Sequence, residues 1–420
     1  MKTWDVIISG AGIIGVSLGL ELRERGAEVL VLDRAEPGRE ASSAAAGMLS
    51  GADPETPVPL WPLTRRSAKL YPQFVEKLER LSGMRADFRR GAIALFPAAT
   101  ETPPEHTPLS STELKKLEPA LSPGDYSAAL AAQENSVDPD LLMKAALLAA
   151  RAAGIEVRGH TAVQQMQSTG AQVEVIAENG RFIAKAAVNC QGAWAGVPVR
   201  PRKGQMLYMQ PKNPALLRHV LRTPDVYLVP RSSGKILVGA TVEDVGYDKT
   251  VIPEAIQDLH RAAAVFMPEL ASALVVSSWA GLRPGTPDDL PILGKTERAG
   301  VFIATGHFRN GILLAPITAK IMADLIGGRS PELDISAFAA GRFGQNSTTD
   351  TESQRGRATT KTQYSPRRHG VTEKSREKAK SKANTKSKPE NNREHRELPQ
   401  NCSGDRKSMK IFVKRKDSQS

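Results

Sequence analysis

The chain has very little cysteine and no long apolar run. Its two cysteines, Cys190 and Cys402, are far apart in 420 residues and have no metal-ligand spacing, which excludes a disulfide framework as the organising principle. No stretch reaches the ~18 uninterrupted apolar residues of a membrane-spanning helix. We therefore expect a protein that has neither a disulfide scaffold nor a membrane span.

The part of the chain before Gly341 has no net charge. Residues 341–420 carry 21 Lys and Arg against 9 Asp and Glu, a difference equal to the +12 of the whole chain. This basic segment is too poor in apolar residues to offset chain entropy by burial. We predict that residues 339–420 form a disordered basic tail, which is either simply solvated or binds polyanions such as nucleic acid weakly.

The rest of the chain is long enough for two domains, and apolar residues make up 40% of the sequence, enough for a sizeable core. The N-terminal segment is apolar but contains Asp5 and the glycines Gly10, Gly12 and Gly15. It predicts a strand and a turn and not a signal peptide. We therefore expect a cytoplasmic enzyme.

A glycine-rich turn joins a strand to a helix at the start of the chain, in the order “WDVIISGAGIIG”, “VSLGLELRERG”, “AEVLVLDR”. Gly10 permits a tight turn, Gly12 lets the backbone approach a pyrophosphate, and Gly15 lets the helix pack closely on the strand. Asp33 ends the second strand, at a distance from Gly15 that lets a carboxylate bind a ribose hydroxyl. The pattern favours a dinucleotide site over a glycine turn without a ligand. We interpret Arg34 as solvated or facing a phosphate.

A run of small residues, “GREASSAAAGML”, follows the second strand from Gly38 to Leu49. It lacks the periodicity of a helix or strand. Small side chains let a backbone lie against a flat ligand, and Ser42 and Ser43 add hydroxyl groups. This composition favours a ligand-contacting segment over a flexible linker.

The middle of the chain predicts one helix and then successive strands. “DPDLLMKAALLAARAAG” has an apolar stripe and ends at Gly154. The residues of that stripe are Leu141, Leu142, Ala145, Leu148 and Ala149. “IEVRGHTAVQQM” and “AQVEVIAENGRFIAKAAVNC” are typical of strands, with Asn179-Gly180 as a hairpin turn.

These segments together resemble the D-amino acid oxidase superfamily of FAD flavoproteins and, within it, the glycine oxidases of the thiamine pathway. Further segments that carry the resemblance are “SVDPDLLMKAA”, “KGQML”, “YLVPR”, “GKILVGAT”, “WAGLRPGTPD” and “TGHFRNGILLAP”. They extend over residues 5–320.

The resemblance implies an α/β (α+β) fold with two intertwined domains. Residues 1–86, 137–199 and 284–338 are expected to form a Rossmann-like FAD-binding domain. Residues 87–136 and 200–283 are expected to form a discontinuous substrate domain around an antiparallel sheet.

The implied cofactor is FAD. Related enzymes that bind flavin covalently do so through a C-terminal cysteine. Here the C-terminal cysteine, Cys402, lies in the tail, and we interpret Cys190 as a small buried residue. We therefore expect non-covalent FAD. The residues expected to contact FAD are Gly10, Gly12, Ile13, Ile14, Gly15, Asp33, Arg34, Ser42, Ser43, Ala46, Gly47, Met48, Val163, Gly192, Gly306, His307, Arg309, Asn310, Gly311, Ile312 and Leu313.

Arg283 is the expected substrate anchor. It follows an apolar approach and precedes Pro284-Gly285, which we expect to form a corner that fixes its direction. The planar guanidinium suits a carboxylate because it gives two parallel charge-assisted bonds. The resemblance implies the same role for Arg283, a hydroxyl donor in Tyr227 and an arginine at the pocket edge in Arg309. We count these three as catalytic.

Val242 occupies a substrate-facing position where the glycine oxidases have methionine. The smaller side chain changes the pocket by roughly a methylene, worth about 1–3 kcal/mol of discrimination. Preference among glycine, sarcosine and D-alanine is therefore open. His307 invites a general-base role, but hydride transfer from a neutral amine needs no protein base, and we favour a structural role.

The expected reaction is oxidative deamination of glycine by O2, giving an imine, then glyoxylate, ammonia and hydrogen peroxide. The resemblance also implies a thiazole synthase as partner, and we expect a homo-oligomer with no metal. Two alternatives stay open: a D-amino acid dehydrogenase that reduces quinone, and an FAD oxidoreductase acting on modified wobble uridines of tRNA. The basic tail would suit the second, whereas the neutral body argues against it.

Overall fold

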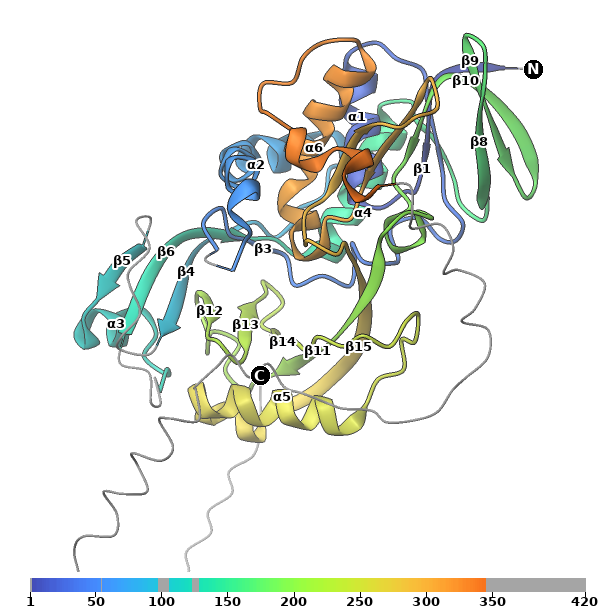
Figure 1. Cartoon of the computed structure of the whole chain (residues 1–420). Coiled ribbons are helices and arrows are strands. Elements are labelled where there is room, and N and C mark those ends of the chain that lie inside the picture. The colour runs from blue at the N-terminus through green and yellow to red at the C-terminus, as the bar shows by residue number, and fades with distance from the viewer. Residues whose placement is uncertain (1, 54, 97–105, 123–127, 345–420) are drawn as a thin grey trace, which may run out of the picture. The chain divides into compact units, whose positions relative to one another are not determined.

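Two β-sheets organise the described part of this computed structural model, residues 2–53, 55–96, 106–122 and 128–344 (Figure 1). All of these residues belong to one compact unit. The mixed α/β fold confirms the predicted class. No helix among the described residues is long and apolar enough to cross a membrane.

The first sheet is mainly parallel, with strand order β16-β17-β10-β1-β2-β7. Strands β8 and β9 extend it through antiparallel pairs with each other and with β10. Its strands are β1 (Thr3–Ser9), β2 (Val29–Leu32), β7 (Glu156–Arg158), β8 (Val163–Thr169), β9 (Gln172–Ala177), β10 (Gly180–Asn189), β16 (Ile292–Lys295) and β17 (Val301–Thr305).

Both faces of this sheet are buried, which explains the continuous apolar runs of β1 and β2. Side chains alternate between the faces, so Val6 and Ile8 join the core under the helices. Ile7 and Leu30 join the opposite core, to which β8 and β9 contribute Met166, Val173 and Val175. A short apolar run can be either a buried strand or part of a buried helix. The runs of β1 and β2 are strands that are packed on both faces.

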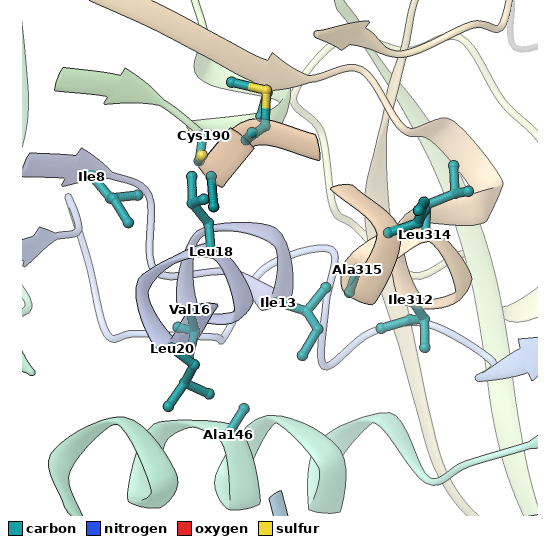
Figure 2. Packing of buried hydrophobic residues seen from close by; sticks show 14 of the residues in the cluster. Ile8, Ile13, Val16, Leu18, Leu20, Ala146, Cys190, Ile312, Leu314 and Ala315 are labelled. Carbon is teal, nitrogen blue, oxygen red and sulfur yellow. The ribbon is translucent and has the colours of Figure 1, made fainter. Parts of the chain in front are cut away.

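Helices cover one face of the parallel sheet. Apolar residues from α1, α4 and α6 share one core with Ile8, and Leu20 of α1 points toward Ala146 of α4 (Figure 2). The helices of the described residues are α1 (Ile13–Glu24), α2 (Trp61–Ser82), α3 (Ser111–Leu117), α4 (Pro139–Ala152), α5 (Pro253–Phe266) and α6 (Gly311–Ile326).

The predicted stripe on α4 is partly wrong. Leu142, Ala145 and Ala149 are buried as expected, but Leu148 is exposed and Leu141 is only half-buried. The inward face also includes Met143, Ala146 and Ala150. Alanines suit this face because α1 and α2 pack closely against α4.

The second sheet is mainly antiparallel, with strand order β15-β11-β14-β13-β12-β4-β6-β3, and β5 pairs with β6. Helix α5 packs against it through Leu259, Ala263 and Phe266. Its strands are β3 (Met48–Leu49), β4 (Arg89–Phe96), β5 (His106–Leu109), β6 (Ala128–Ser136), β11 (Arg200–Gln210), β12 (Val220–Arg222), β13 (Tyr227–Pro230), β14 (Ile236–Gly239) and β15 (Leu274–Gly285).

The chain passes between the two sheets several times, as the discontinuous domains require. The predicted domain boundaries themselves stay a proposal. Near the predicted tail, Ala340–Phe343 form a helical turn, and Arg342 binds Asp288 at 2.8 Å and the carbonyl of Leu290. Residues 339–344 therefore belong with the folded part, and the remainder of the predicted tail lies outside the described residues.

The predicted strands of the middle region form with one difference. “IEVRGHTAVQQM” contains two strands, β7 and β8, which bend apart at residues 159–162. The expected hairpin joins β9 to β10, where Ala177 pairs with Gly180 across the turn.

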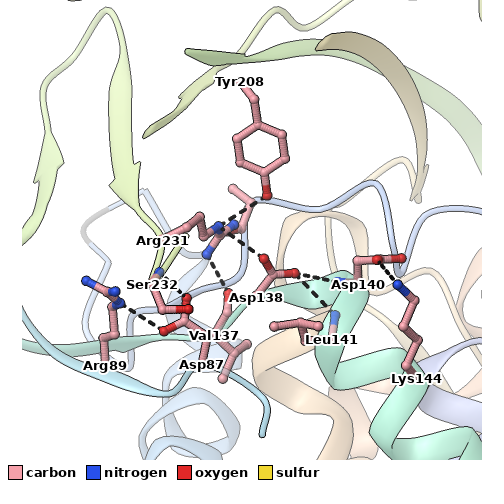
Figure 3. Close-up of polar contacts among 11 residues, drawn as sticks. Asp87, Arg89, Val137, Asp138, Asp140, Leu141, Lys144, Tyr208, Arg231 and Ser232 are labelled. Atoms are coloured by element: carbon pink, nitrogen blue, oxygen red, sulfur yellow. Dashed lines mark hydrogen bonds and ion pairs between the residues drawn. The ribbon is translucent and has the colours of Figure 1, made fainter. Parts of the chain in front are cut away.

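Arg231, next to β13, joins the second sheet to the segments that lead into α4 and β3 (Figure 3). Its buried guanidinium donates to the carbonyls of Val137 at 2.8 Å and Ala46 at 2.7 Å, and to the Tyr208 hydroxyl at 3.2 Å. Asp138, 3.7 Å from Arg231, also caps the N-terminus of α4. The end of the strand that carries Tyr227 is therefore anchored to the first helix layer.

Candidate active site

A cavity of about 350 Å³ lies where strand ends of the two sheets meet. Most predicted site residues line it, although they come from distant parts of the sequence. The predicted residues on its wall are Gly10, Gly12, Ile13, Ile14, Asp33, Arg34, Ser42, Ala46, Gly47, Met48, Val163, Gly192, Tyr227, Val242, Arg283, Gly306, His307, Arg309, Asn310, Gly311 and Ile312.

Three predicted residues do not line the cavity. A Cβ on Gly15 would lie 1.9 Å from the carbonyl oxygen of Gly10, so Gly15 serves the close packing of α1. Leu313 is buried in the helix core. The Ser43 hydroxyl donates to the carbonyl of Glu40 at 3.4 Å. These residues support the wall from behind.

The glycine-rich turn forms one end of the cavity, which we call the nucleotide end. Gly10 has φ of +110°, and a Cβ there would lie 2.2 Å from the carbonyl oxygen of Cys190. Ala11 N–H donates to the Asp33 carboxylate at 2.7 Å. Ile13 N–H donates to the Ser42 hydroxyl at 3.0 Å. The turn is thus shaped by its own neighbours, with Asp33 at the end of β2.

The pKa of Asp33 is raised because the carboxyl is largely desolvated, although the hydrogen bonds from Ala35 and Ala11 oppose the shift. Burial also raises the pKa of the Cys190 thiol to about 12. Cys190 is therefore a buried neutral thiol, as its interpretation as a small buried residue requires.

Arg283 lies on the cavity wall at the other end, which we call the substrate end. Its guanidinium crosses Gly204 of the neighbouring strand β11, where a Cβ would lie 2.1 Å from Arg283 Nη1. Nη1 also donates to the carbonyl of Thr241 at 3.3 Å. The glycine of “KGQML” therefore makes room for the predicted anchor.

The expected corner after Arg283 is wrong in detail. Pro284 and Gly285 are the last residues of β15 and pair with Pro201 and Arg200 of β11. The chain turns afterwards, at residues 286–290. Pairing along β11, rather than a corner, holds Arg283 in place.

Tyr227 faces the same end of the cavity from β13. Its hydroxyl lies 3.4 Å from Met206 Sδ, and a Cβ on the paired Gly239 would lie 2.5 Å from that hydroxyl. Val242 lies on the cavity wall as expected. Two glycines, one beside each predicted anchor, thus leave room for a long polar side chain.

Arg309, in the turn Phe308–Asn310 before α6, forms an ion pair with Glu55 and also donates to its backbone carbonyl at 3.4 Å. Arg309 lines the cavity, and its role at the pocket edge stays a prediction. The pair links the segment after β3 to the start of α6.

A charged group on the same wall was missed from the sequence. Arg222 binds Asp53 at 2.9 Å and Glu134 at 2.8 Å, and Glu134 accepts from the Ser50 hydroxyl at 2.5 Å. The two carboxylates raise the pKa of Arg222 even though burial opposes it. The partners are so far apart along the chain that no local pattern predicts this group.

His307 is buried, and its Nε2 lies 3.1 Å from the Thr318 hydroxyl. Desolvation lowers the pKa of His307 from 6.5 to about 3. The imidazole is therefore neutral at physiological pH. This agrees with a structural role, because a proton acceptor with so low a pKa is weak.

A second buried network stands behind Arg283. The Glu243 carboxylate accepts from the Thr241 hydroxyl at 2.5 Å and the Gln205 amide at 2.7 Å, and lies 3.3 Å from Lys203 Nζ. Lys203 is only 1% exposed. The network holds residue 241, whose carbonyl accepts from Arg283.

A family model described as FAD dependent oxidoreductase matches residues 5–325. The bifunctional protein ThiO/ThiG of Trichormus variabilis is 35% identical over 371 residues, which cover 83% of this chain and 56% of that protein. This chain thus spans about half the length of the ThiO/ThiG relatives it matches.

The glycine oxidase of Geobacillus kaustophilus is 33% identical over 366 residues, covering 81% of this chain and 97% of that protein. The crystal structure of glycine oxidase from the same organism matches with a TM-score of 0.77 at 31% identity, covering 81% and 99%. The hydrogen cyanide synthase subunit HcnC of Pseudomonas aeruginosa is 31% identical over 407 residues, covering 81% and 97%.

Proposed function

This chain belongs to the FAD dependent oxidoreductase family, and from that membership we propose that it oxidises glycine to the imine, which hydrolyses to glyoxylate and ammonia while O2 is reduced to hydrogen peroxide. The single observation that carries the choice of substrate is the placement of Arg283 on the cavity wall over Gly204. Such a cation suits the carboxylate of a small amino acid.

The cavity fits FAD, the cofactor of the family. At the nucleotide end, a side chain on Gly10 would collide with Cys190, and one on Gly12 would contact the Ser42 hydroxyl at 3.1 Å, so the turn keeps its backbone open for a pyrophosphate. Asp33 would hold the ribose, and the loop from Gly306 to Ile312 faces the same cavity. When bound, FAD supplies the ring that accepts the hydride.

The residues at the substrate end would orient the substrate. Arg283 would hold the carboxylate by a bidentate pair, and Tyr227 would donate one further hydrogen bond. Met48, Met206 and Val242 give this wall an apolar surface that limits the size of the Cα substituent. Glycine, sarcosine and D-alanine remain the candidate substrates.

A screen with glycine, sarcosine, D-alanine and D-proline tests the proposal, with coupled detection of hydrogen peroxide. We expect glycine-dependent peroxide from the wild type and a much lower value from Arg283→Ala with FAD still bound. Reduction of an artificial dye by D-alanine without peroxide would instead support the dehydrogenase alternative. Peroxide from none of the four amino acids would contradict the oxidase proposal.

The non-covalent state of FAD is a separate expectation. Acid precipitation should release the flavin into the supernatant. Flavin that stays with the pellet would mean that a covalent bond forms, contrary to the interpretation of Cys190 and Cys402.

The partner proposals rest on the relatives. The ThiO/ThiG proteins join two activities in one chain, which supports transfer of the imine product to a separate thiazole-forming protein. Homo-oligomerisation, a cytoplasmic location and weak polyanion binding by the basic tail stay predictions. Comparison of the full chain with a chain lacking residues 345–420 on heparin would test the last of these.

A further inference from the structure

An exposed segment between β14 and α5, residues 244–250, contacts the wall of the cavity from the side of the second sheet. The Tyr247 hydroxyl donates to the carbonyl of Ala193 at 2.8 Å. Lys249 Nζ lies 3.0 Å from Glu40 Oε2. Ala193 and Glu40 both line the cavity, so this segment reaches from one sheet to the ligand site of the other.

Glu40 connects the segment to Arg34. Its second oxygen lies 2.8 Å from Arg34 Nη2, so one carboxylate holds one cation from each side. The Arg34 guanidinium lies 3.7 Å from the centre of the Trp194 ring. The Trp194 and Tyr247 rings are 5.5 Å apart with an interplanar angle of 31°. The contacts form a chain Lys249–Glu40–Arg34–Trp194–Tyr247 that closes on the segment itself.

This chain of contacts lies at the nucleotide end. Arg34 follows Asp33, the carboxylate placed to bind a ribose, and Ala193 and Trp194 belong to the turn Gly192–Trp194 that follows β10. In a Rossmann-type site the ribose carboxylate marks the adenosine half of the dinucleotide, while the pyrophosphate lies at the helix N-terminus. The segment therefore contacts the adenosine side of the site and not the substrate end.

The hydrogen bonds that fix the two ends of the segment do not account for the contacts of Tyr247 and Lys249. On one side Glu243 and Lys203 exchange two backbone hydrogen bonds of 2.9 Å, and on the other Ile252 N–H donates to Gln205 at 2.6 Å. Between the anchors Tyr247 is 53% exposed, yet its hydroxyl and ring are both directed to the cavity wall. An aromatic residue in an exposed loop gains little unless it covers something.

We propose that residues 244–250 are a clamp that retains the ADP half of FAD, with Tyr247 and Lys249 as its contact residues and Glu40 as the group that joins the clamp to Arg34. Sequence patterns place the cofactor site in the first sheet alone. The clamp is a further part of that site, and it comes from a segment connected to the second sheet. It is independent of which amine is the substrate.

Titration of the apoprotein with FAD, followed by flavin fluorescence, tests the clamp. Tyr247→Ala should raise the FAD dissociation constant roughly 3- to 30-fold, mainly through faster FAD release, because it removes a ring contact and a hydrogen bond. Tyr247→Phe keeps the ring and should give a smaller increase. Lys249→Ala should weaken binding only a few-fold, since exposed ion pairs contribute little.

Lys212→Ala is the matched control, because it removes an exposed lysine of the same sheet region that is outside the cavity wall. It should bind FAD like the wild type. With saturating FAD, Lys212→Ala should also keep the wild-type glycine KM and kcat. The FAD and ADP affinities of Tyr247→Ala are measured without glycine, which separates the clamp from the proposed substrate chemistry. ADP alone should also bind the Tyr247→Ala apoprotein more weakly than the wild-type apoprotein.

Melting temperatures distinguish retention of the cofactor from a general structural role. We expect a small drop for the Tyr247→Ala apoprotein, which loses its contacts to Ala193 and Trp194, and a clearly larger drop for the FAD-loaded variant. Wild-type affinity for FAD and ADP in Tyr247→Ala would overturn the proposal. An equal loss of stability in the apo and loaded forms would overturn it as well.

Discussion

The glycine turn at the nucleotide end and the wall at the substrate end are built in opposite ways. The turn uses backbone groups and glycines between Gly10 and Asp33, and Asp33 accepts the N–H groups of Ala11 and Ala35. The substrate end uses charged side chains from β12, β15 and the segment after β3. Arg222 joins Asp53 to Glu134, two carboxylates that are far apart along the chain.

Under the proposed function, this difference follows from the charge that each end has to hold. A polarised backbone binds phosphate through several partial charges, and the geometry of a short turn provides them. A single carboxylate needs a full cation, and every buried cation needs compensating groups of its own. The substrate end is therefore surrounded by ion pairs, while the turn at the nucleotide end depends on the absence of side chains.

The largest effect should come from Arg283→Ala. Removal of one partner of a desolvated charge pair costs about 2–5 kcal/mol, or roughly 30- to 4,000-fold in kcat/KM for glycine. Arg200→Ala, which changes an exposed arginine on the adjacent strand, serves as the control. Near-normal kcat/KM in Arg283→Ala would indicate that Arg309 is the anchor. It would contradict the assignment of Arg283 to the substrate end.

Gly204→Ala should be the next largest. The added Cβ would displace the Arg283 guanidinium, and a shift of about 1 Å at a binding group can cost on the order of 100-fold. FAD affinity should stay at the wild-type value. Gly19→Ala is the control, because its Cβ meets only ordinary contacts of 3.6 Å or more. A loss of FAD in Gly204→Ala would show that the two ends are not separable.

Gly10→Ala and Gly12→Ala sharpen the comparison at the nucleotide end. Gly10 combines φ of +110° with a 2.2 Å approach to Cys190, so alanine there should lower the unfolding free energy of the apoprotein by about 1–3 kcal/mol. Gly12→Ala meets only the Ser42 side chain, so it should reduce FAD affinity with little loss of apoprotein stability. Thermal unfolding and FAD titration measure the two effects, and identical behaviour of both variants would contradict this division.

His307 should have the smallest effect at neutral pH. Its native pKa of about 3 lies below the ordinary 6.5, so the unfolded state binds more protons between these values, and stability falls as the pH drops through this window. The loss can reach about 1.4 kcal/mol per pH unit. His307→Asn should lack this component in urea unfolding between pH 6.5 and 4. Its kcat/KM profile should keep the wild-type shape, and disappearance of the limb by which activity falls toward acidic pH would support the general-base role.

Patterns within short windows predicted the glycine turn, the first helix and the β9–β10 hairpin, because each depends on neighbouring residues. The face of α4 was predicted less well. Leu148 satisfied the helical period but points to solvent, whereas Ala146 and Ala150 are buried because other helices pack there. Periodicity locates an apolar face only approximately when small residues form the contact.

The sequence by itself determined the turn at Gly10 and the carboxylate at Asp33, since each follows from a short stretch of chain. It also indicated the family, through motifs distributed over residues 5–320. Only the tertiary structure decided that Gly204 makes room for Arg283, that Asp53 and Glu134 compensate Arg222, and that residues 244–250 reach the nucleotide end. The physical reason is that strand pairing brings together side chains that are distant along the chain. Charge pairing and steric room are properties of those contacts, so no motif with a fixed residue spacing reports them in the sequence.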